Sequence, residues 1–392
     1  MITIVQISKP IKPVPGRAVT RLSELVAAAT EEICGDSLIV STPERYASFL
    51  LTPGKTHKIV YLLAVEGELS ARVTSAYGFP LVAGSPDGVA LWENWLSKHP
   101  TSITPEAPWD NRVLGSCEVT VPMKENLDSA YVDFQSLEQD ADVLAPLWEV
   151  AQHILQVEGR TKVGSWTDNP LGDELSAPSS TLSFNHTHIS HFLADAGFEV
   201  NQNEQCIRLD LPVAEETLNS KEAEAKQKAE GYRFISWEGP TPPQYLEKYV
   251  NLINAFHADI PTVGLISNEM EVDVGRLTLA ESNDVKRGTL QVVTAAEHIE
   301  TGDLVGYTKY DLYRDSVMAV QEDTLVLKDH RGHRLGLLVK IENLRYLQEH
   351  YRDRTIAQTW NAGENDWMIA INGQLGYQPY IASGQWQIEL KH

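Results

Sequence analysis

The stretch KDHRGHRLGLLVK, residues 328–340, combines basic and titratable side chains with two glycines and runs directly into an apolar segment. The residues before it, SVMAVQEDTLVL (316–327), read as a β-strand, and the apolar residues after the glycines recur at helical spacing. A strand that ends in such a loop and begins a helix presents free backbone N–H groups and the positive end of the helix dipole to one point. The sequence therefore predicts an anion-binding site, and phosphate is the anion that fits.

Glycines and positive charge both favour this interpretation. Gly332 and Gly336 would let the backbone approach the anion closely. The alternative is a solvated turn followed by a basic first helical turn, but basic residues at that place oppose the helix dipole. The side chains that would surround the anion are His330, Arg331, His333 and Arg334.

The composition is that of an acidic globular protein. Its 392 residues carry 54 acidic and 32 basic side chains, for a formal net charge of −22, so the surface repels a nucleic-acid backbone. No apolar run approaches the ~18 residues of a membrane span, and the first residues lack the layout of a signal peptide. We therefore expect a cytoplasmic protein with neither a nucleic-acid nor a membrane partner. Three widely spaced cysteines indicate buried thiols rather than a disulfide framework.

The length predicts two domains. The segment SKEAEAKQKAEG (220–231) reads as a short helix with almost no apolar face, begun by Ser220 and ended by Gly231, and this is typical of a linker. We therefore expect an N-terminal lobe over residues 1–215, a helical linker over 216–230 and a C-terminal lobe over 231–392.

The periodicity of the second lobe predicts alternating strands and helices. A repeat supports two lobes of the same kind, because Trp360 follows Arg331 by 29 residues and Trp166 follows Gln139 by 27. The first lobe carries an insertion, NPLGDELSAPSSTLS (169–183), which we expect to be a loop. In the second lobe we expect strands over 231–239, 289–296, 303–313, 316–327 and 354–362 and near the C-terminus, and helices over 242–261, from 335 and over 364–376.

The loop RGHRLG resembles the pyrophosphate loop of the GNAT acetyltransferase superfamily, Gln/Arg-x-x-Gly-x-Gly/Ala. TLVLKDHRGHRLG and TWNAGENDWMIAINGQLGY together look like the coenzyme A half of that superfamily. The resemblance is strong over about 289–377, and the first lobe looks like a worn second copy, as in tandem GNAT proteins of the mycothiol synthase-like kind. It implies an α+β fold of two tandem lobes, each a mixed, mostly antiparallel sheet flanked by helices.

The resemblance also implies a cofactor site for acetyl-CoA as cosubstrate. Backbone groups of Leu325, Val326 and Leu327 would bind the pantetheine arm, and Asn361 and Asn365 would lie beside it. The residues that would hold the pyrophosphate are Arg331, Gly332, His333, Arg334, Leu335 and Gly336.

Two positions depart from the family's pattern. Arg334 stands where glycine is usual, so either Gly332 supplies the backbone freedom or the arginine side chain contacts phosphate. Asn372 stands where the family commonly has a tyrosine that protonates the departing thiolate. Because an amide cannot act as that acid, coenzyme A would leave as thiolate or be protonated by water.

The carboxylates Glu322 and Asp323 are the candidates for the base that deprotonates an amine nucleophile. Side chains alternate along a strand, so only one of the two can point into the cleft. An unbulged strand favours Glu322, on one face with Thr324 and Val326, whereas a bulge would transfer the role to Asp323.

The first lobe has QDADVL (139–144) at the place of the loop, without glycine and with Asp140 and Asp142 facing the expected pyrophosphate position. Like charge repels there, so this copy is expected to be structural or to shape the acceptor pocket. NHTHISH (185–191) could bind a metal or be a polar loop that leads into a helix, and we expect no metal. HADIPTVG (257–264) lines the acceptor pocket or is a proline-stiffened loop.

The function expected from these features is N-acetyl transfer from acetyl-CoA to an amine of a small molecule, by direct attack in a ternary complex. The identity of the acceptor and of the acyl group stays open, as does the choice between a monomer and a homodimer. The alternative is a non-catalytic module that binds coenzyme A or a protein partner. The acidity of the chain counts against a third hypothesis, transfer from aminoacyl-tRNA.

Overall fold

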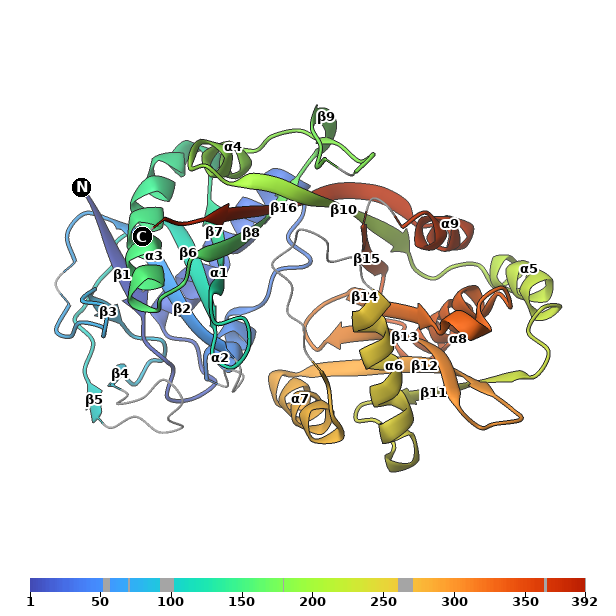
Figure 1. Cartoon of the computed structure of the whole chain (residues 1–392). Helices are drawn as coiled ribbons and strands as arrows, with labels where there is room; N and C mark the ends of the chain where they lie inside the picture. The colour runs from blue at the N-terminus through green and yellow to red at the C-terminus, as the bar shows by residue number, and fades with distance from the viewer. Residues whose placement is uncertain are drawn as a thin grey trace. The chain divides into compact units, whose positions relative to one another are not determined.

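The computed structural model describes residues 1–51, 57–69, 71–91, 102–178, 180–259, 271–362 and 365–391. They form two compact units (Figure 1). The first contains the described residues up to Asn203 and from Ile381 onward, and the second contains those from Glu204 to Tyr380. No helix in these ranges is long and apolar enough to cross a membrane.

The sheet of the first unit is mostly antiparallel and has the order β16-β8-β7-β6-β2-β1-β3. Its helices cover both faces, because neighbouring residues of β2 belong to different cores: Leu62 packs with α3 and Leu63 with α1. The strands are β1 (Ile2–Ile7), β2 (His57–Glu66), β3 (Leu81–Val82), β6 (Val113–Pro122), β7 (Ser129–Ser136), β8 (Lys162–Asn169) and β16 (Gln378–Glu389), with β4 (Val89–Leu91), β5 (Ser102–Thr104) and β9 (Leu171–Leu175) outside it. The helices are α1 (Arg17–Cys34), α2 (Pro43–Leu51), α3 (Leu144–Val157) and α4 (His188–Asp195).

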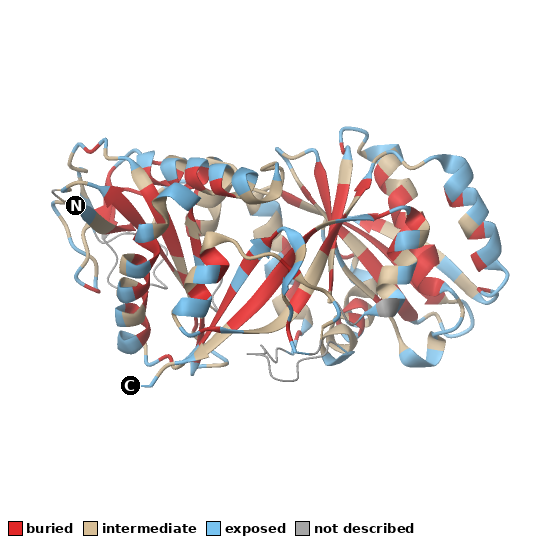
Figure 2. Ribbon diagram, turned by 90° about the horizontal axis from the view of Figure 1, so that it is seen from above, coloured by how far each residue is buried: buried red, intermediate tan, exposed pale blue. Residues whose placement is uncertain are grey.

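The sheet of the second unit has the order β11-β12-β13-β14-β15-β10. Val292 and Val293 of β12 again point into different cores, one beneath α8 and the other beneath α6 and α7. Buried residues concentrate on the strands and on the helix faces turned towards them (Figure 2). The strands are β10 (Glu199–Asp210), β11 (Tyr232–Glu238), β12 (Thr289–His298), β13 (Leu304–Tyr313), β14 (Met318–Val326) and β15 (Ile356–Ala362). The helices are α5 (Glu215–Lys226), α6 (Leu246–Asp259), α7 (Val274–Arg287), α8 (Leu335–His350) and α9 (Asp366–Leu375).

The predicted repeat is confirmed by topology. In each unit a strand is followed by a helix and then by a second strand that pairs with the first in parallel, β7-α3-β8 in one and β14-α8-β15 in the other. The remaining pairs of β14 and β7 are antiparallel.

The compact units do not coincide with the lobes expected over 1–215 and 231–392, because they exchange strands. The second half of β10 pairs with β15 from Glu204↔Ala362 to Asp210↔Ile356, so residues before the expected linker complete the second sheet. The second half of β16 pairs with β8 in the first unit. Such pairings join residues far apart in the sequence, and local patterns do not reveal them.

The helix interpreted as a linker is part of the second core, so that interpretation is wrong. It begins at Glu215 rather than after Ser220, and the side chains of Leu218 and Ala225 are buried against α8. Arg345 of α8 also pairs with Glu222 at 2.8 Å. Leu218 lies before the segment 220–231 and Ala225 alone forms no apolar stripe, so the local sequence does not reveal the buried face of this helix.

Two further elements differ from the expectation. The insertion over 169–183 contains the short strand β9 rather than only a loop. The helix α7 was not predicted, although Asp273 caps its start by accepting from the Arg276 N–H at 2.7 Å and Gly288 ends it. Of the cysteines, Cys117 and Cys206 are buried as expected, but Cys34 is only half-buried.

The strand exchange predicts that a fragment of residues 231–392 is poorly soluble and inactive. It lacks β10, which leaves the edge of β15 unpaired, and it carries the end of β16 without its partner β8. Expression followed by size-exclusion chromatography tests this, with residues 204–380 as the matched fragment that keeps the half of β10 paired with β15 and ends before the exchanged part of β16. A soluble, fully active 231–392 fragment would contradict the prediction.

Candidate functional site

A β-bulge divides β14 at the two carboxylates. Thr308 of β13 pairs with Thr324, but Tyr310 pairs with Gln321, so that Glu322 and Asp323 together lie opposite one residue of β13. The unbulged strand assumed from the sequence is therefore wrong. The bulge shifts the alternation of the strand by one residue.

The backbone beyond the bulge has an open side. β14 pairs with β15 only through Met318, Ala319 and Val320. Leu327 N–H donates to Val305 O at 2.9 Å, so by alternation the N–H groups of Thr324 and Val326 point away from β13. These groups face the side where β15 no longer pairs with β14. Unpaired N–H groups of this kind are what a strand needs to bind an extended ligand.

The loop that follows has two residues in the left-handed region. Gly332 has φ +86°, and Arg334, which precedes the first turn of α8, has φ +59°. An arginine in this conformation costs about 1–3 kcal/mol. Gly332 and Arg334 therefore both contribute left-handed backbone to the loop, and Arg334 adopts this conformation although it is not glycine.

Within the described part of the chain, several backbone donors of this loop are unpaired. The N–H groups of Gly332, His333 and Arg334 donate to no acceptor among the described residues. The next N–H groups belong to the first turn of α8, where intrahelical acceptors are missing. Gly336 keeps this turn close to its neighbours, since a Cβ there would lie 3.3 Å from Ile371 Cδ1 of α9.

Most basic side chains of the loop bind other groups of the protein and do not extend into the space where an anion was expected. Arg331 pairs with Asp259 at the end of α6, which Lys328 also contacts at 3.2 Å, and its Nε donates to Val326 O at 3.1 Å. Burial would raise the pKa of Asp259, but hydrogen bonds from Arg331 and Lys328 outweigh it and hold that pKa below its usual value. Arg334 is exposed, and its guanidinium makes no hydrogen bond or ion pair with a described residue.

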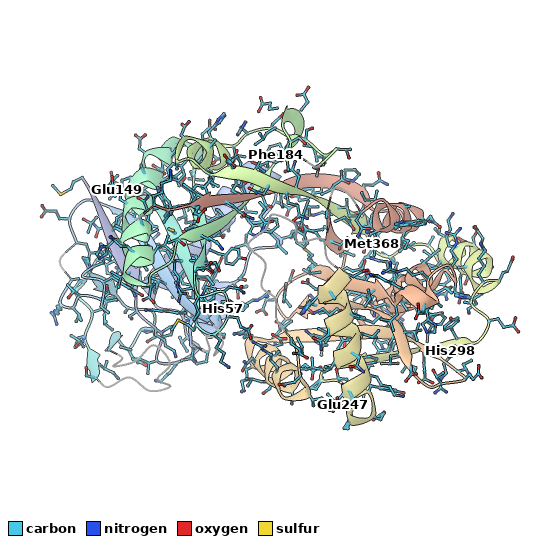
Figure 3. All side chains as sticks on the ribbon, viewed as in Figure 1. His57, Glu149, Phe184, Glu247, His298 and Met368 are labelled. Atoms are coloured by element: carbon cyan, nitrogen blue, oxygen red, sulfur yellow. The ribbon has the colours of Figure 1, made fainter. Side chains whose placement is uncertain are left out.

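Two histidines of the loop, His330 and His333, lie with His298 of β12 around Tyr232 of β11. His330 Nδ1 lies 2.9 Å from the Tyr232 hydroxyl, and the His298 and His333 rings lie 5.4 Å and 5.3 Å from the Tyr232 ring. Figure 3 labels His298 at the end of β12 and Met368 on α9. His333 Nδ1–H donates to Lys228 O at 2.9 Å. His330 therefore anchors the loop to β11, and His333 anchors it to the segment between α5 and β11.

Glu322 and Asp323 have different surroundings. Asp323 Oδ2 accepts from the Tyr307 hydroxyl at 3.1 Å and lies 3.9 Å from Lys309 Nζ. Glu322 keeps access to solvent and makes no hydrogen bond or ion pair with a described residue. Partial desolvation on the strand, with repulsion by Asp311, raises the pKa of Glu322 to about 7 against the opposing effect of Lys309. Glu322 is thus a carboxylate without a hydrogen-bond partner in the described ranges and with a pKa near neutral pH, whereas Asp323 is held by the Tyr307 hydroxyl.

Of the three asparagines implied by the resemblance, Asn361 lies on β15, Asn365 precedes the first residue of α9, and Asn372 lies in the second half of α9. Asn372 is fully buried, and its Nδ2–H donates to Asn361 Oδ1 at 3.2 Å. Asn361 Nδ2 and Asn372 Oδ1 are buried and have no partner among the described residues. Asn365 is exposed and caps α9 by accepting from Met368 N–H at 3.2 Å. Asn372 therefore holds β15 to α9.

The corresponding place in the first unit has a different character. Its loop is the short helix Glu138–Val143, in which Arg112 pairs with Asp140. Where β7 and β8 stop pairing, a cavity of about 110 Å³ is lined by residues that include Asp133 and Asp168. Burial and repulsion by neighbouring carboxylates raise the pKa of Asp133 to about 7. Such acidic surroundings do not suit a pyrophosphate.

The other candidates from the sequence are not drawn together into a site. His186 stacks on His191 with 4.2 Å between ring centroids, and His188 Nε2 lies 3.1 Å from Ser136 Oγ. In the ranges that the structure covers, no three His, Cys, Asp or Glu side chains form a metal-binding group. Of the expected acceptor segment 257–264, residues 260–264 lie outside the described ones.

Sequence comparison alone finds no relative, since no family model matches the chain and no curated protein matches it significantly. Solved structures are similar along its whole length. A tandem GNAT protein from the clavulanic acid biosynthesis pathway has a TM-score of 0.68 at 20% identity, over 99% of this chain and 98% of that chain. A GCN5-related N-acetyltransferase from Sphaerobacter thermophilus has a TM-score of 0.57 at 12% identity, over 99% and 96%.

A glucosamine N-acetyltransferase region of a fungal multi-domain beta-N-acetylglucosaminidase has a TM-score of 0.53 at 10% identity, over 99% of this chain and 38% of that chain. At such identities the similarity concerns the fold. The parallel strand pair that recurs in both units agrees with a tandem arrangement. The chain has the α+β fold of tandem GNAT proteins.

Proposed function

We propose that the protein is an acetyl-CoA-dependent N-acetyltransferase whose second unit binds the cosubstrate. The observation that carries the proposal is the set of unpaired backbone N–H groups that runs from the open side of β14 into the loop 332–334 and the first turn of α8. An extended ligand with a pyrophosphate at one end would use all of them. The exposed guanidinium of Arg334 would add positive charge next to the pyrophosphate.

The reaction proposed is direct transfer to an amine. The neutral amine attacks the thioester carbonyl, the new C–N bond forms and the C–S bond breaks. Glu322 accepts the proton that the amine loses, and the N–H groups of Thr324 or Val326 stabilise the negative charge on the carbonyl oxygen. Asn372 is buried and is an amide, so the thiolate would take its proton from water.

The first unit is proposed to be structural or to shape the acceptor site. The loop at the equivalent place has no glycine, and its Asp140 already pairs with Arg112. Its surroundings repel phosphate, so the two units are not equivalent towards acetyl-CoA.

Titration calorimetry with acetyl-CoA tests the proposal, and we expect one molecule bound per chain. Asp140→Asn with Asp142→Asn should leave the affinity unchanged, because these residues belong to the unit without a cofactor loop. Two equivalent sites would contradict the assignment to the second unit, and no binding would contradict the function.

Release of coenzyme A thiol separates the enzyme from the alternative, a module that only binds coenzyme A or a partner. A panel of small amines, mixed with protein and acetyl-CoA, should contain acceptors that accelerate thiol release. Tight binding without thiol release for any amine would favour the module.

A further inference from the structure

A lysine lies inside the core of the second unit without a carboxylate partner. Lys340 of α8 is 1% exposed, and its Nζ donates to Gln321 Oε1 at 2.7 Å. No described Asp or Glu pairs with it, and burial lowers its pKa from 10.5 to about 7, so the amine can stay in the core as a neutral donor. An apolar side chain of similar length would avoid the cost of burying this group. The question is what the lysine does at that place.

Its partner Gln321 is the centre of a buried hydrogen-bond network. Gln321 is 2% exposed, and its Oε1 also accepts from the Tyr377 hydroxyl at 3.0 Å. Its Nε2–H donates to Thr308 Oγ1 at 3.2 Å, and that oxygen lies 2.7 Å from Thr324 Oγ1. The network therefore connects α8 to the residue before the β14 bulge and to the residue after its two carboxylates.

The bulge decides which groups of β14 face outward. If the register of Tyr310↔Gln321 continued without interruption, Asp323 and Leu325 would turn their backbone N–H groups away from β13. With the bulge, Thr324 and Val326 do so instead, and Glu322 stands in the bulged part of the strand. A contact that holds Gln321 and Thr324 in place therefore holds the open side of the strand in its observed register.

We propose that Lys340 is a positioning residue, which acts through Gln321 to hold the β14 bulge and with it Glu322 and the outward N–H groups of Thr324 and Val326. The consequence for acetyl transfer rests on the proposed function, whereas the effect on the strand does not. The buried neutral donor is suited to this task, because it orients the Gln321 amide without requiring a buried counter-ion.

Asn343, one turn further along α8, offers a matched control. It is also fully buried, and its Nδ2–H donates to Val292 O at 3.2 Å and to Thr294 Oγ1 at 2.9 Å, both on β12. Asn343→Leu thus removes a buried polar contact of the same helix to the same sheet but leaves β14 untouched. Lys340→Met keeps the length of the side chain and removes the donor.

The experiment measures hydrogen exchange of peptides spanning β14 in the ligand-free full chain, together with the acetyl-CoA dissociation constant. For Lys340→Met we expect exchange at residues 321–326 to accelerate and the dissociation constant to rise, each by about tenfold, as for the loss of one buried hydrogen bond. Gln321→Met removes the same contact together with the hydrogen bonds to Tyr377 and Thr308, so its effects should be at least as large. The double variant should be no worse than Gln321→Met alone, because the contact of Lys340 is then already lost. Urea unfolding should show Lys340→Met at least as stable as the wild type, so these changes would not reflect general unfolding.

Unchanged exchange of β14 in Lys340→Met would overturn the proposal, and so would equal acceleration in Asn343→Leu. Fully additive effects in the double variant would show that Lys340 does not act through Gln321. If the wild type binds no acetyl-CoA, the proposed function fails, but the exchange measurement on the ligand-free protein still decides whether Lys340 holds the strand.

Discussion

Replacing Glu322 by Gln is expected to lower the rate of coenzyme A thiol release by about 10²-fold or more, because the amide cannot accept the proton of the amine. In the wild type, burial and the repulsion by Asp311 raise the pKa of Glu322 to about 7. The rate should therefore rise with pH through about 7, as the carboxylate forms, and then level off unless the amine titrates higher. The variant should lose this dependence at the same acetyl-CoA affinity. Stopped-time thiol assays across the pH range, with an acceptor from the amine panel, measure both effects.

The control is Asp323→Asn. Asp323 already accepts from Tyr307 and lies near Lys309, so its loss should affect the rate less than the loss of Glu322 does. The effect on folding follows from the raised pKa. Between the ordinary pKa of 4.5 and the folded-state pKa of about 7, the folded protein holds a proton on Glu322 that the unfolded chain has lost. The charged carboxylate therefore disfavours folding increasingly through this range and fully above it. Glu322→Gln should therefore be at least as stable as the wild type at neutral pH. Full rates in both variants would show that the base is elsewhere or that the acceptor arrives neutral.

The second large effect is expected for Gly336→Leu, which should weaken acetyl-CoA binding by about 10²-fold or more, equivalent to one or two lost charge-assisted hydrogen bonds. A side chain there would begin 3.3 Å from Ile371 Cδ1 and 3.8 Å from Val326 Cγ2. It would enter the space between α9 and the end of β14 and displace the first turn of α8 from the pyrophosphate. Calorimetry measures the loss.

Gly336→Ala and Gly373→Ala are the controls. The nearest atom to a Cβ at Gly336 is the flexible end of Ile371, so alanine should fold normally and weaken binding less than leucine does. Gly373 lies in α9 with no atom within 4 Å of a Cβ, so alanine there should leave the affinity unchanged and stabilise the helix by up to about 1 kcal/mol. Unimpaired binding in Gly336→Leu would remove the loop 331–336 from the proposed site.

Local patterns in the sequence were sufficient for most elements of the second unit, with α7 and β10 as exceptions. Hydrophobic periodicity and turn residues predicted β11 to β15, α6, α8 and α9, and Gly376 does end α9 in the left-handed conformation. The position of the loop between β14 and α8 was also predictable, since glycines, basic residues and a helix start are contiguous. The sequence also carries a signal for Lys340, because a single charged residue in the otherwise apolar run LGLLVKI indicates a buried lysine.

The tertiary structure alone decided what depends on residues far apart in the chain. The register between β13 and β14 creates the bulge, and the bulge gives Glu322 and Asp323 different surroundings. The alternation of side chains along a strand does not predict this difference. The pairing of β10 with β15 and of β16 with β8 sets the bounds of the compact units. Arg331 is occupied by Asp259, which lies 72 residues before it. Periodicity reports which residues lie on one face of an element, whereas strand register and ion pairs are settled only when the elements pack, because they depend on the distances between elements.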